Sequence, residues 1–125
     1  MRRLAFLVAP ALAITALSGA ALAHTKLLSS TPAPNTTVTR PTKLTLTFSE
    51  VLVGPLSGIE LVMTGMPGMA SHAPMPIKGF KTATAGKVLI VTLPRALPAG
   101  TYDLKWHAVA SDQHRVESQY TFTVR

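Results

Sequence analysis

A short segment of the chain, Met63 to Met75, holds every methionine other than the initiator. The segment also contains His72, and its glycines and prolines predict a loop rather than a helix or a paired strand. Thioether sulfur is an uncharged, polarizable ligand that selects Cu(I) over harder divalent cations, and imidazole adds a stronger donor. The segment therefore predicts a Cu(I) site. Its candidate ligands are Met63, Met66, Met69, His72 and Met75.

Two other uses of these methionines compete with metal binding. Methionine most often fills gaps in a hydrophobic core, but core methionines are expected on periodic strands, not on a segment broken by glycine and proline. An adaptable surface that contacts another protein is the stronger alternative.

The N-terminus predicts export. Arg2 and Arg3 are followed by an apolar run from Leu4 to Leu17 and by small residues that end at Ala23, which are the three parts of a secretory signal peptide. The apolar run is shorter than the roughly 20 residues that a membrane-spanning helix needs. We therefore expect a signal peptide over residues 1–23 and an exported domain over residues 24–125 that does not span a membrane.

Cleavage at this position would make His24 the first residue. An N-terminal histidine offers its free α-amine and its ring nitrogen to one metal ion, and the amine gives up its proton to Cu(II) easily near neutral pH. Asp112 and His114 are two residues apart, which places both side chains on one side of an extended segment. Together these nitrogen and oxygen donors suit tetragonal Cu(II). Glu50 is a further candidate oxygen ligand or else a surface carboxylate.

The composition excludes several other functions. The chain has no cysteine, so it has no disulfide, no thiol nucleophile and no thiolate metal site. The net charge is +7, but after the signal peptide no two lysines or arginines are adjacent, which argues against a nucleic-acid-binding surface. No constellation of nucleophile and base points to catalysis, so the chain is not expected to be an enzyme.

The elements that must position these residues are predicted to be strands. Prolines and glycines argue against long helices, and short alternating runs are separated by turn signals. About seven such strands predict an all-β fold, an immunoglobulin-like Greek-key β-sandwich or a small closed barrel. The expected strands are Lys26–Ser29, Lys43–Phe48, Gly58–Val62, Ile77–Lys81, Lys87–Leu93, Thr101–Ala108 and Ser118–Val124.

The strand pattern also predicts the core. Alternation places Tyr102 and Trp106 on the inner face of their strand and His107 on its outer face. Tyr102 follows a Pro-Ala-Gly turn, as the tyrosine of a corner does in immunoglobulin-like domains.

Four stretches of the chain resemble the CopC/PcoC family of periplasmic copper-resistance proteins. They are the start at His24, the strand end Phe48-Ser49-Glu50, the Met63–Met75 segment and the stretch from Trp106 to His114. The resemblance covers essentially all of residues 24–125. It implies a Greek-key β-barrel of immunoglobulin-like type with two separate copper sites. The implied Cu(II) ligands are His24, Asp112 and His114, with Glu50 in some members, and the implied Cu(I) ligands are Met63, Met66, Met69, His72 and Met75.

The sequence thus predicts a periplasmic copper-binding and carrier protein that serves copper homeostasis and resistance. Its expected partners are copper ions and an inner-membrane copper transporter or another periplasmic copper protein. Two alternatives stay open. One is a copper oxygenase with an N-terminal histidine brace, which the low aromatic content of 6% disfavours. The other is a metal-free immunoglobulin-like module that binds another protein.

Overall fold

The structure, a computed structural model, describes residues 24–125, so the expected signal peptide lies outside the described residues. Within that range the chain forms nine β-strands and one short 3-10 helix, η1 (Gly54–Leu56). Seven strands have five residues or more, in agreement with the prediction of about seven, and two are residue pairs. The strands are β1 (Leu27–Thr31), β2 (Thr37–Val38), β3 (Lys43–Phe48), β4 (Gly58–Gly65), β5 (Met75–Pro76), β6 (Lys81–Ala85), β7 (Val88–Thr92), β8 (Gly100–Val109) and β9 (Arg115–Val124).

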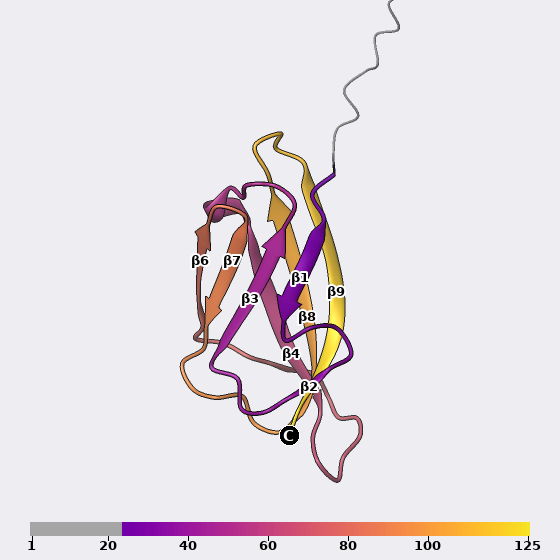
Figure 1. Cartoon of the computed structure of the whole chain (residues 1–125). Coiled ribbons are helices and arrows are strands. Elements are labelled where there is room, and N and C mark those ends of the chain that lie inside the picture. Colours follow the sequence, from indigo (N-terminus) through magenta and orange to yellow (C-terminus); the bar gives the residue numbers. More distant parts are fainter. Residues whose placement is uncertain (1–23) are drawn as a thin grey trace, which may run out of the picture.

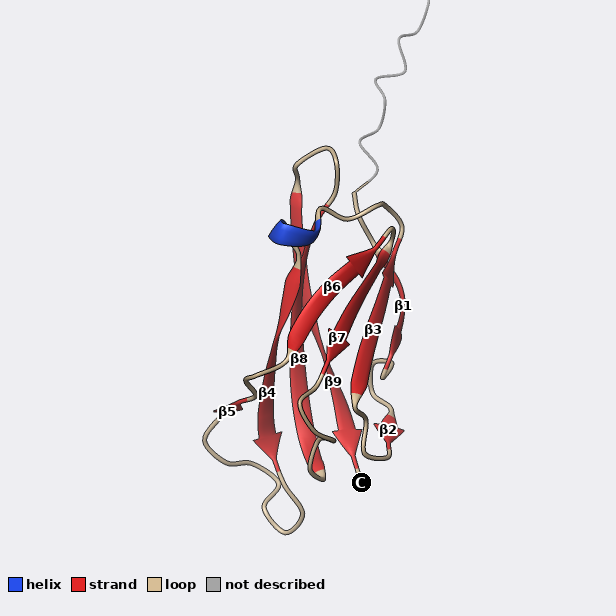
Figure 2. Cartoon of the chain, turned by 90° about the vertical axis from the view of Figure 1, so that its left-hand side faces the viewer, coloured by secondary structure: helices blue, strands red, loops and turns tan. Residues whose placement is uncertain are grey.

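The strands form two sheets that face each other. One sheet has the order β1-β3-β7-β6 and the other has the order β2-β9-β8-β4-β5 (Figure 1). All pairings are antiparallel except that of β2 with β9. The chain crosses between the sheets after β1, β2, β3, β5 and β7. Figure 2 shows β6, β7, β3 and β1 side by side in that order from left to right. The fold is therefore a β-sandwich, as predicted, and the alternative of a closed barrel does not apply. Among residues 24–125 no helix is long and apolar enough to cross a membrane.

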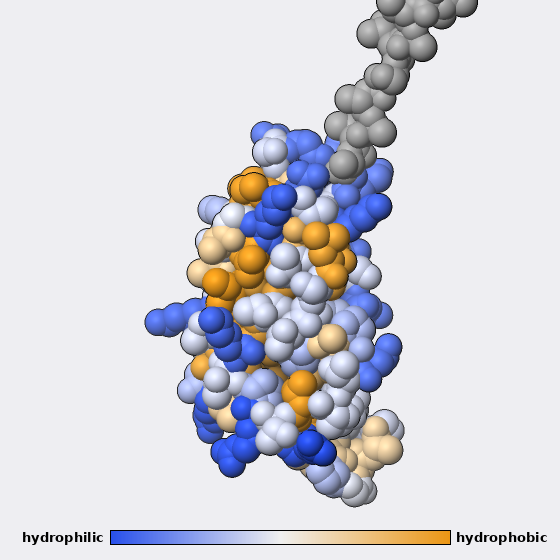
Figure 3. Space-filling model, in the orientation of Figure 1, coloured by the Kyte–Doolittle hydropathy of each residue, from blue (hydrophilic) through white to orange (hydrophobic). Residues whose placement is uncertain are grey.

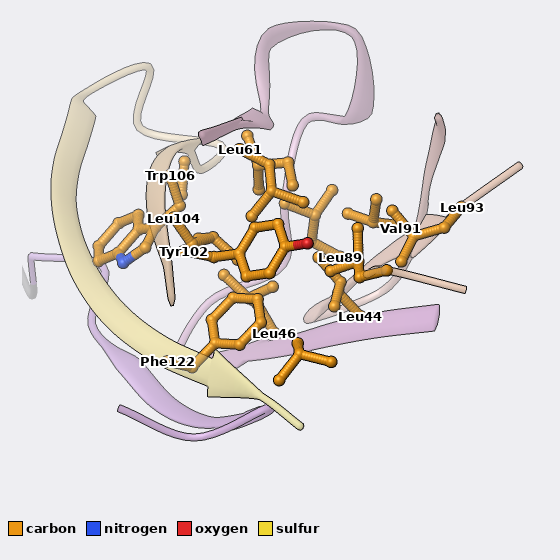
Figure 4. Packing of buried hydrophobic residues seen from close by; sticks show 14 of the residues in the cluster. Leu44, Leu46, Leu61, Leu89, Val91, Leu93, Tyr102, Leu104, Trp106 and Phe122 are labelled. Carbon is orange, nitrogen blue, oxygen red and sulfur yellow. The ribbon is translucent and has the colours of Figure 1, made fainter. Parts of the chain in front are cut away.

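Alternating side chains build the core between the sheets. In β3 the inward residues Leu44, Leu46 and Phe48 are fully buried, and threonines lie between them. From the other sheet Tyr102 stacks on Phe122 with ring centroids 5.5 Å apart, and leucines of both sheets surround the pair (Figure 4). This apolar burial is the main stabilising contribution to the fold.

Tyr102 also closes the turn before its own strand. Its hydroxyl donates a hydrogen bond of 2.6 Å to the carbonyl oxygen of Pro98, which is the corner expected from the sequence. Burial raises the pKa of Tyr102 to about 12. The phenol therefore stays a hydrogen-bond donor over the whole physiological range.

One expected strand is misplaced. The structure has no strand over residues 77–80, and β6 begins only at Lys81. Gly79 has a φ of +83°, which interrupts the extended path. β6 itself is a mostly exposed edge strand of lysine, threonine and alanine, so it has no apolar alternation that would have revealed it.

Candidate metal centres

The two predicted groups of ligands lie at opposite ends of the sandwich. β8 connects the ends: Thr101 pairs with Gly65 beside the methionine segment, and Ala110 follows Val109 at the other end, next to Asp112. A ten-residue strand is about 30 Å long at roughly 3.3 Å per residue. In Figure 1 the loop between β4 and β5 projects at the bottom, and the β8–β9 loop lies at the top. One metal ion cannot contact both groups.

Met66 and Met69 form a tight two-residue hairpin beyond the end of β4. Each backbone N–H donates to the other residue's carbonyl oxygen at 2.9 Å. Pro67 and Gly68 occupy the turn, and Gly68 has a φ of +80°, as position three of a type II turn requires. Residues paired in this way carry their side chains on the same face. The hairpin therefore holds two exposed thioethers side by side.

Met63 and Met75 lie in paired strands and not in a loop, so the loop prediction is wrong for these two residues. Met63 lies in β4 and pairs directly with Met75 in β5. Met63 is buried in the core, with its methyl group against Gly100, so the core-filling use that the sequence disfavoured applies to it. Met75 lies on the edge of the sheet and is half exposed. Pro76 ends this edge strand, where a missing N–H is tolerated.

The ring of His72 is held in one orientation by its own segment of the chain. Its backbone N–H donates to the Thr64 carbonyl at 3.0 Å, which ties the segment back to β4. Its Nδ1 lies 2.7 Å from the Ala73 carbonyl oxygen, and since a carbonyl only accepts, Nδ1 carries the proton. Nε2 therefore carries the lone pair, and this atom is buried without a hydrogen-bond partner. A second ring nitrogen bonded to a backbone carbonyl is the usual support of a metal-binding histidine.

The methionine end has no charged side chain of its own. No Asp, Glu, Lys or Arg occurs between Leu61 and Ile77. In the space-filling view of Figure 3 the projecting loop at the lower right is pale orange to white. Neutral soft donors without a carboxylate favour a monovalent soft ion over Zn²⁺, Mg²⁺ or Ca²⁺.

At the other end Asp112 and His114 form a compact pair. One carboxylate oxygen of Asp112 accepts a hydrogen bond of 3.2 Å from the His114 backbone N–H, and the other lies 3.2 Å from Nδ1 of His114. Gln113 between them has a φ of +64° and donates its N–H to the Ala110 carbonyl. The backbone N–H and the imidazole of His114 hold the pKa of Asp112 below its ordinary value. The pair presents a carboxylate and the free Nε2 of His114 to solvent.

The chain next to His24 is anchored at this same end. Thr25 is buried. The Lys26 N–H donates to the Ser49 hydroxyl, and the Ser49 N–H donates to the Lys26 carbonyl, each at 2.9 Å. These bonds place His24 beside the end of β3, where Glu50 follows Ser49. Sequence reasoning missed Thr25 and Ser49, because small polar residues next to a strand carry no distinctive signal.

The structure does not bring all four predicted Cu(II) ligands into contact. Within residues 24–125 no three His, Asp or Glu side chains come together as a group that could hold a metal. Asp112 and His114 contact each other, whereas His24 and Glu50 lie at the same end without joining them. In the uncut chain the nitrogen of His24 is a peptide amide and not an amine, so it is a much poorer donor.

His107 was expected at the surface and is half-buried on the outer face of its sheet. Its ring lies close to Gly58, which has no Cβ that would displace it. Burial, and secondly the charge of Arg115, lower the pKa of His107. The residue lines a hollow of about 460 Å³ together with Glu60, Lys105 and Glu117. None of the predicted copper ligands lies in this hollow.

Comparison with known proteins gives concordant matches. Residues 27–125 match the family model described as the CopC domain. The chain is 47% identical over 106 residues to the copper resistance protein C of Escherichia coli, covering 84% of each chain. It is 45% identical over 109 residues to the copper resistance protein C of Pseudomonas syringae pv. tomato, covering 86% of each. Its structure is similar to that of PcoC, a methionine-rich copper resistance protein from Escherichia coli, with a TM-score of 0.73 and 42% identity, covering 82% of this chain and 100% of the other.

Proposed function

The chain belongs to the CopC family, and we propose that it is an exported copper-binding protein of copper resistance and homeostasis that carries Cu(I) and Cu(II) at opposite ends of one domain. The proposal includes removal of residues 1–23 on export to the periplasm and a binding domain over residues 24–125. Soft donors without charge at one end and nitrogen and oxygen donors at the other support this division.

For Cu(I) we propose the ligands Met66, Met69, Met75 and Nε2 of His72. The three methionines are exposed, and the hairpin presents two of them on one face. Met63, which belonged to the set predicted from the sequence, is given a packing role, because it is only 5% exposed and lies opposite Met75. It supports the edge strand from the core.

The observation that carries this assignment is the buried, unpartnered Nε2 of His72. A buried nitrogen lone pair without a hydrogen bond costs on the order of 1–3 kcal/mol, and coordination of a metal ion would remove that cost. The thioethers are neutral and hold the ion loosely, which suits a carrier that passes its cargo on.

The test is a Cu(I) competition titration against a chromophoric chelator under reducing conditions. The double variant Met66→Leu/Met69→Leu is expected to lose affinity by tenfold or more. Met63→Leu is the matched control, since it removes one thioether at similar volume from the core. Equal affinities in the wild type and the double variant would overturn the Cu(I) assignment.

For Cu(II) we propose the α-amine and imidazole of His24, the Asp112 carboxylate and Nε2 of His114, with Glu50 as an outer oxygen ligand. Removal of the signal peptide would turn the His24 amide into an amine and complete the donor set. Cu(II) titration followed by EPR tests this proposal on the processed protein and on a form with one extra residue before His24. Identical spectra and affinities in the two forms would overturn it.

A carrier function is favoured over copper oxygenase activity. Oxidation of a polysaccharide would require an exposed aromatic surface for the substrate, but Tyr102, Trp106 and Phe122 are all buried. Cargo would pass to or from an inner-membrane copper transporter or another periplasmic copper protein.

A further inference from the structure

A preformed apolar groove lies next to the methionine end. It has a volume of about 250 Å³ and lies between the segment that follows β5 and the loop that follows β7. That loop runs at the lower left of Figure 1. Leu93 and Leu97 are buried, and the prolines around them are exposed. The apolar lining includes Pro76, Ile77, Leu93, Pro94, Leu97 and Pro98.

Backbone hydrogen bonds fix both walls of this groove. Leu93 N–H donates to the Thr42 carbonyl at 2.9 Å and Leu97 N–H donates to the Pro41 carbonyl at 3.1 Å. On the opposite wall Ile77 N–H donates to the Leu61 carbonyl at 2.8 Å. A ligand would therefore meet a shaped surface without first ordering the loop, which lowers the entropic cost of binding.

The charges at this groove are all positive. Lys78 and Arg95 line it and are exposed. In the part of the chain that the structure describes, the ion pairs join Asp112 to His114 and Arg115 to Glu117, so neither cation has a carboxylate partner there. No Asp or Glu occurs between Glu60 and Asp103, the stretch that supplies the whole lining of the groove.

The groove is continuous with the proposed Cu(I) ligands. Pro76 lines it and directly follows Met75, which is 50% exposed. A chain seated in the groove therefore passes next to a thioether that we assign to the metal.

We propose that this groove docks an acidic, apolar segment of a partner protein and holds that partner beside the Cu(I) ligands. Aliphatic side chains of the segment fill the groove, and its carboxylates pair with Lys78 and Arg95. A concave groove with only two cations suits an extended peptide better than a membrane, because anionic lipid is recognised by larger basic clusters on a flat or helical face. The purpose of the docking rests on the proposed copper function, but the docking itself needs no copper.

The test measures binding of fluorescent peptides to the exported protein by anisotropy. The probe peptide has a central Leu-Pro-Leu flanked by two glutamates on each side. One comparison peptide replaces the glutamates with glutamines, and another replaces the leucines with serines. The acidic, apolar peptide is expected to bind about tenfold more tightly than either comparison peptide, and its affinity is expected to fall with added salt.

Charge-matched variants locate the site. Lys78→Gln/Arg95→Gln is expected to weaken binding of the probe peptide about tenfold. Lys26→Gln/Lys87→Gln removes the same charge from exposed residues at the opposite end, beside Ser49 and Phe48, and is expected to leave binding unchanged. Pro94 is an exposed residue of the groove lining. Pro94→Glu would place a negative charge there, and it is expected to weaken binding of the acidic peptide without loss of folding.

Several outcomes would overturn the proposal. One is that the probe peptide does not bind. Another is that Lys78→Gln/Arg95→Gln and Lys26→Gln/Lys87→Gln weaken its binding equally. A third is that phosphatidylserine vesicles bind through Lys78 and Arg95 in place of the peptide. Cu(I) affinity and peptide binding, both measured on the double variant Met66→Leu/Met69→Leu, separate the two proposals. If the methionine variants keep full Cu(I) affinity while the peptide still binds, the copper assignment fails and the docking site stands.

Discussion

Met63 and Met75 lie directly opposite each other on β4 and β5, yet Met63 is 5% exposed and Met75 is 50% exposed. Directly paired residues carry their side chains on the same face of a sheet, so the two thioethers are neighbours. The boundary between core and surface passes between them. The Met63–Met75 segment therefore contains two kinds of methionine. Met63 packs in the core, and the others are exposed and accessible to a metal ion.

Substitution of these two residues by leucine is expected to separate the roles. Met75→Leu should weaken Cu(I) binding by tenfold or more with little change in stability, since its side chain is half exposed. Met63→Leu should keep the Cu(I) affinity and lower the free energy of unfolding by less than about 1.5 kcal/mol, because the core volume is nearly conserved. Chelator competition and urea unfolding measure the two effects. Equal losses of Cu(I) affinity in both variants would return Met63 to the ligand set.

The ring of His72 makes a second prediction. Its Nε2 is buried without a hydrogen-bond partner, and a leucine at this position offers no donor atom to a metal ion. His72→Leu should therefore weaken Cu(I) binding by tenfold or more, as measured by chelator competition under reducing conditions. Equal Cu(I) affinities in the wild type and in His72→Leu would show that His72 is not a ligand.

The turn at Gly68 should matter for binding more than for folding. A methyl group on Gly68 would meet no atom within 4 Å, but its φ of +80° disfavours any residue with a Cβ by about 1 kcal/mol. Gly68→Ala should therefore loosen the pairing of Met66 with Met69 and weaken Cu(I) binding several-fold. Gly86→Ala is the matched control, because Gly86 has a φ of +59° and open space but lies in the β6–β7 turn. Equal effects on Cu(I) affinity would contradict the role given to the hairpin.

Strand β3 shows what the sequence could predict well. Its strict alternation of leucine and threonine reproduces the observed bounds Lys43–Phe48, because one face is fully buried and the other is not. The tyrosine corner was predictable for a similar reason, since a local turn and a single aromatic side chain suffice to form it.

The methionine segment shows where prediction from the sequence fails. Gly65 and the prolines indicated a loop, but β4 continues through Met63 to Gly65 because pairing with β8 extends that far. Tertiary pairing of this kind leaves no local signal. The anchoring of the chain next to His24 by Thr25 and Ser49 could not be predicted from the sequence either, because it depends on contacts between distant segments.

Removal of the Tyr102 hydroxyl should cost stability in a pH-dependent way. Tyr102→Phe loses the hydrogen bond to Pro98 and is expected to lower the free energy of unfolding by about 1 kcal/mol near neutral pH. In the wild type the pKa of Tyr102 is raised to about 12 from 10.0. The neutral phenol therefore stabilises the fold fully below pH 10, and that contribution is lost as the pH rises toward 12. Urea unfolding followed by the fluorescence of Trp106 should show a steeper alkaline loss in the wild type than in the variant. Tyr120 is present in both proteins, so parallel alkaline losses would contradict this assignment.

The carboxylate of Asp112 should be required for Cu(II) and dispensable for folding. Asp112→Asn keeps an oxygen that can accept from the His114 N–H but removes the charge, so the turn should persist while Cu(II) affinity falls by tenfold or more. Glu117→Gln is the matched control, because it removes one negative charge from the neighbouring strand, where Glu117 pairs with Arg115 at 3.2 Å. If Asp112 is a ligand, only Asp112→Asn should change the EPR spectrum of the processed protein. Equal loss of affinity in the two variants, with unchanged spectra, would show that Asp112 acts only through the general electrostatic field.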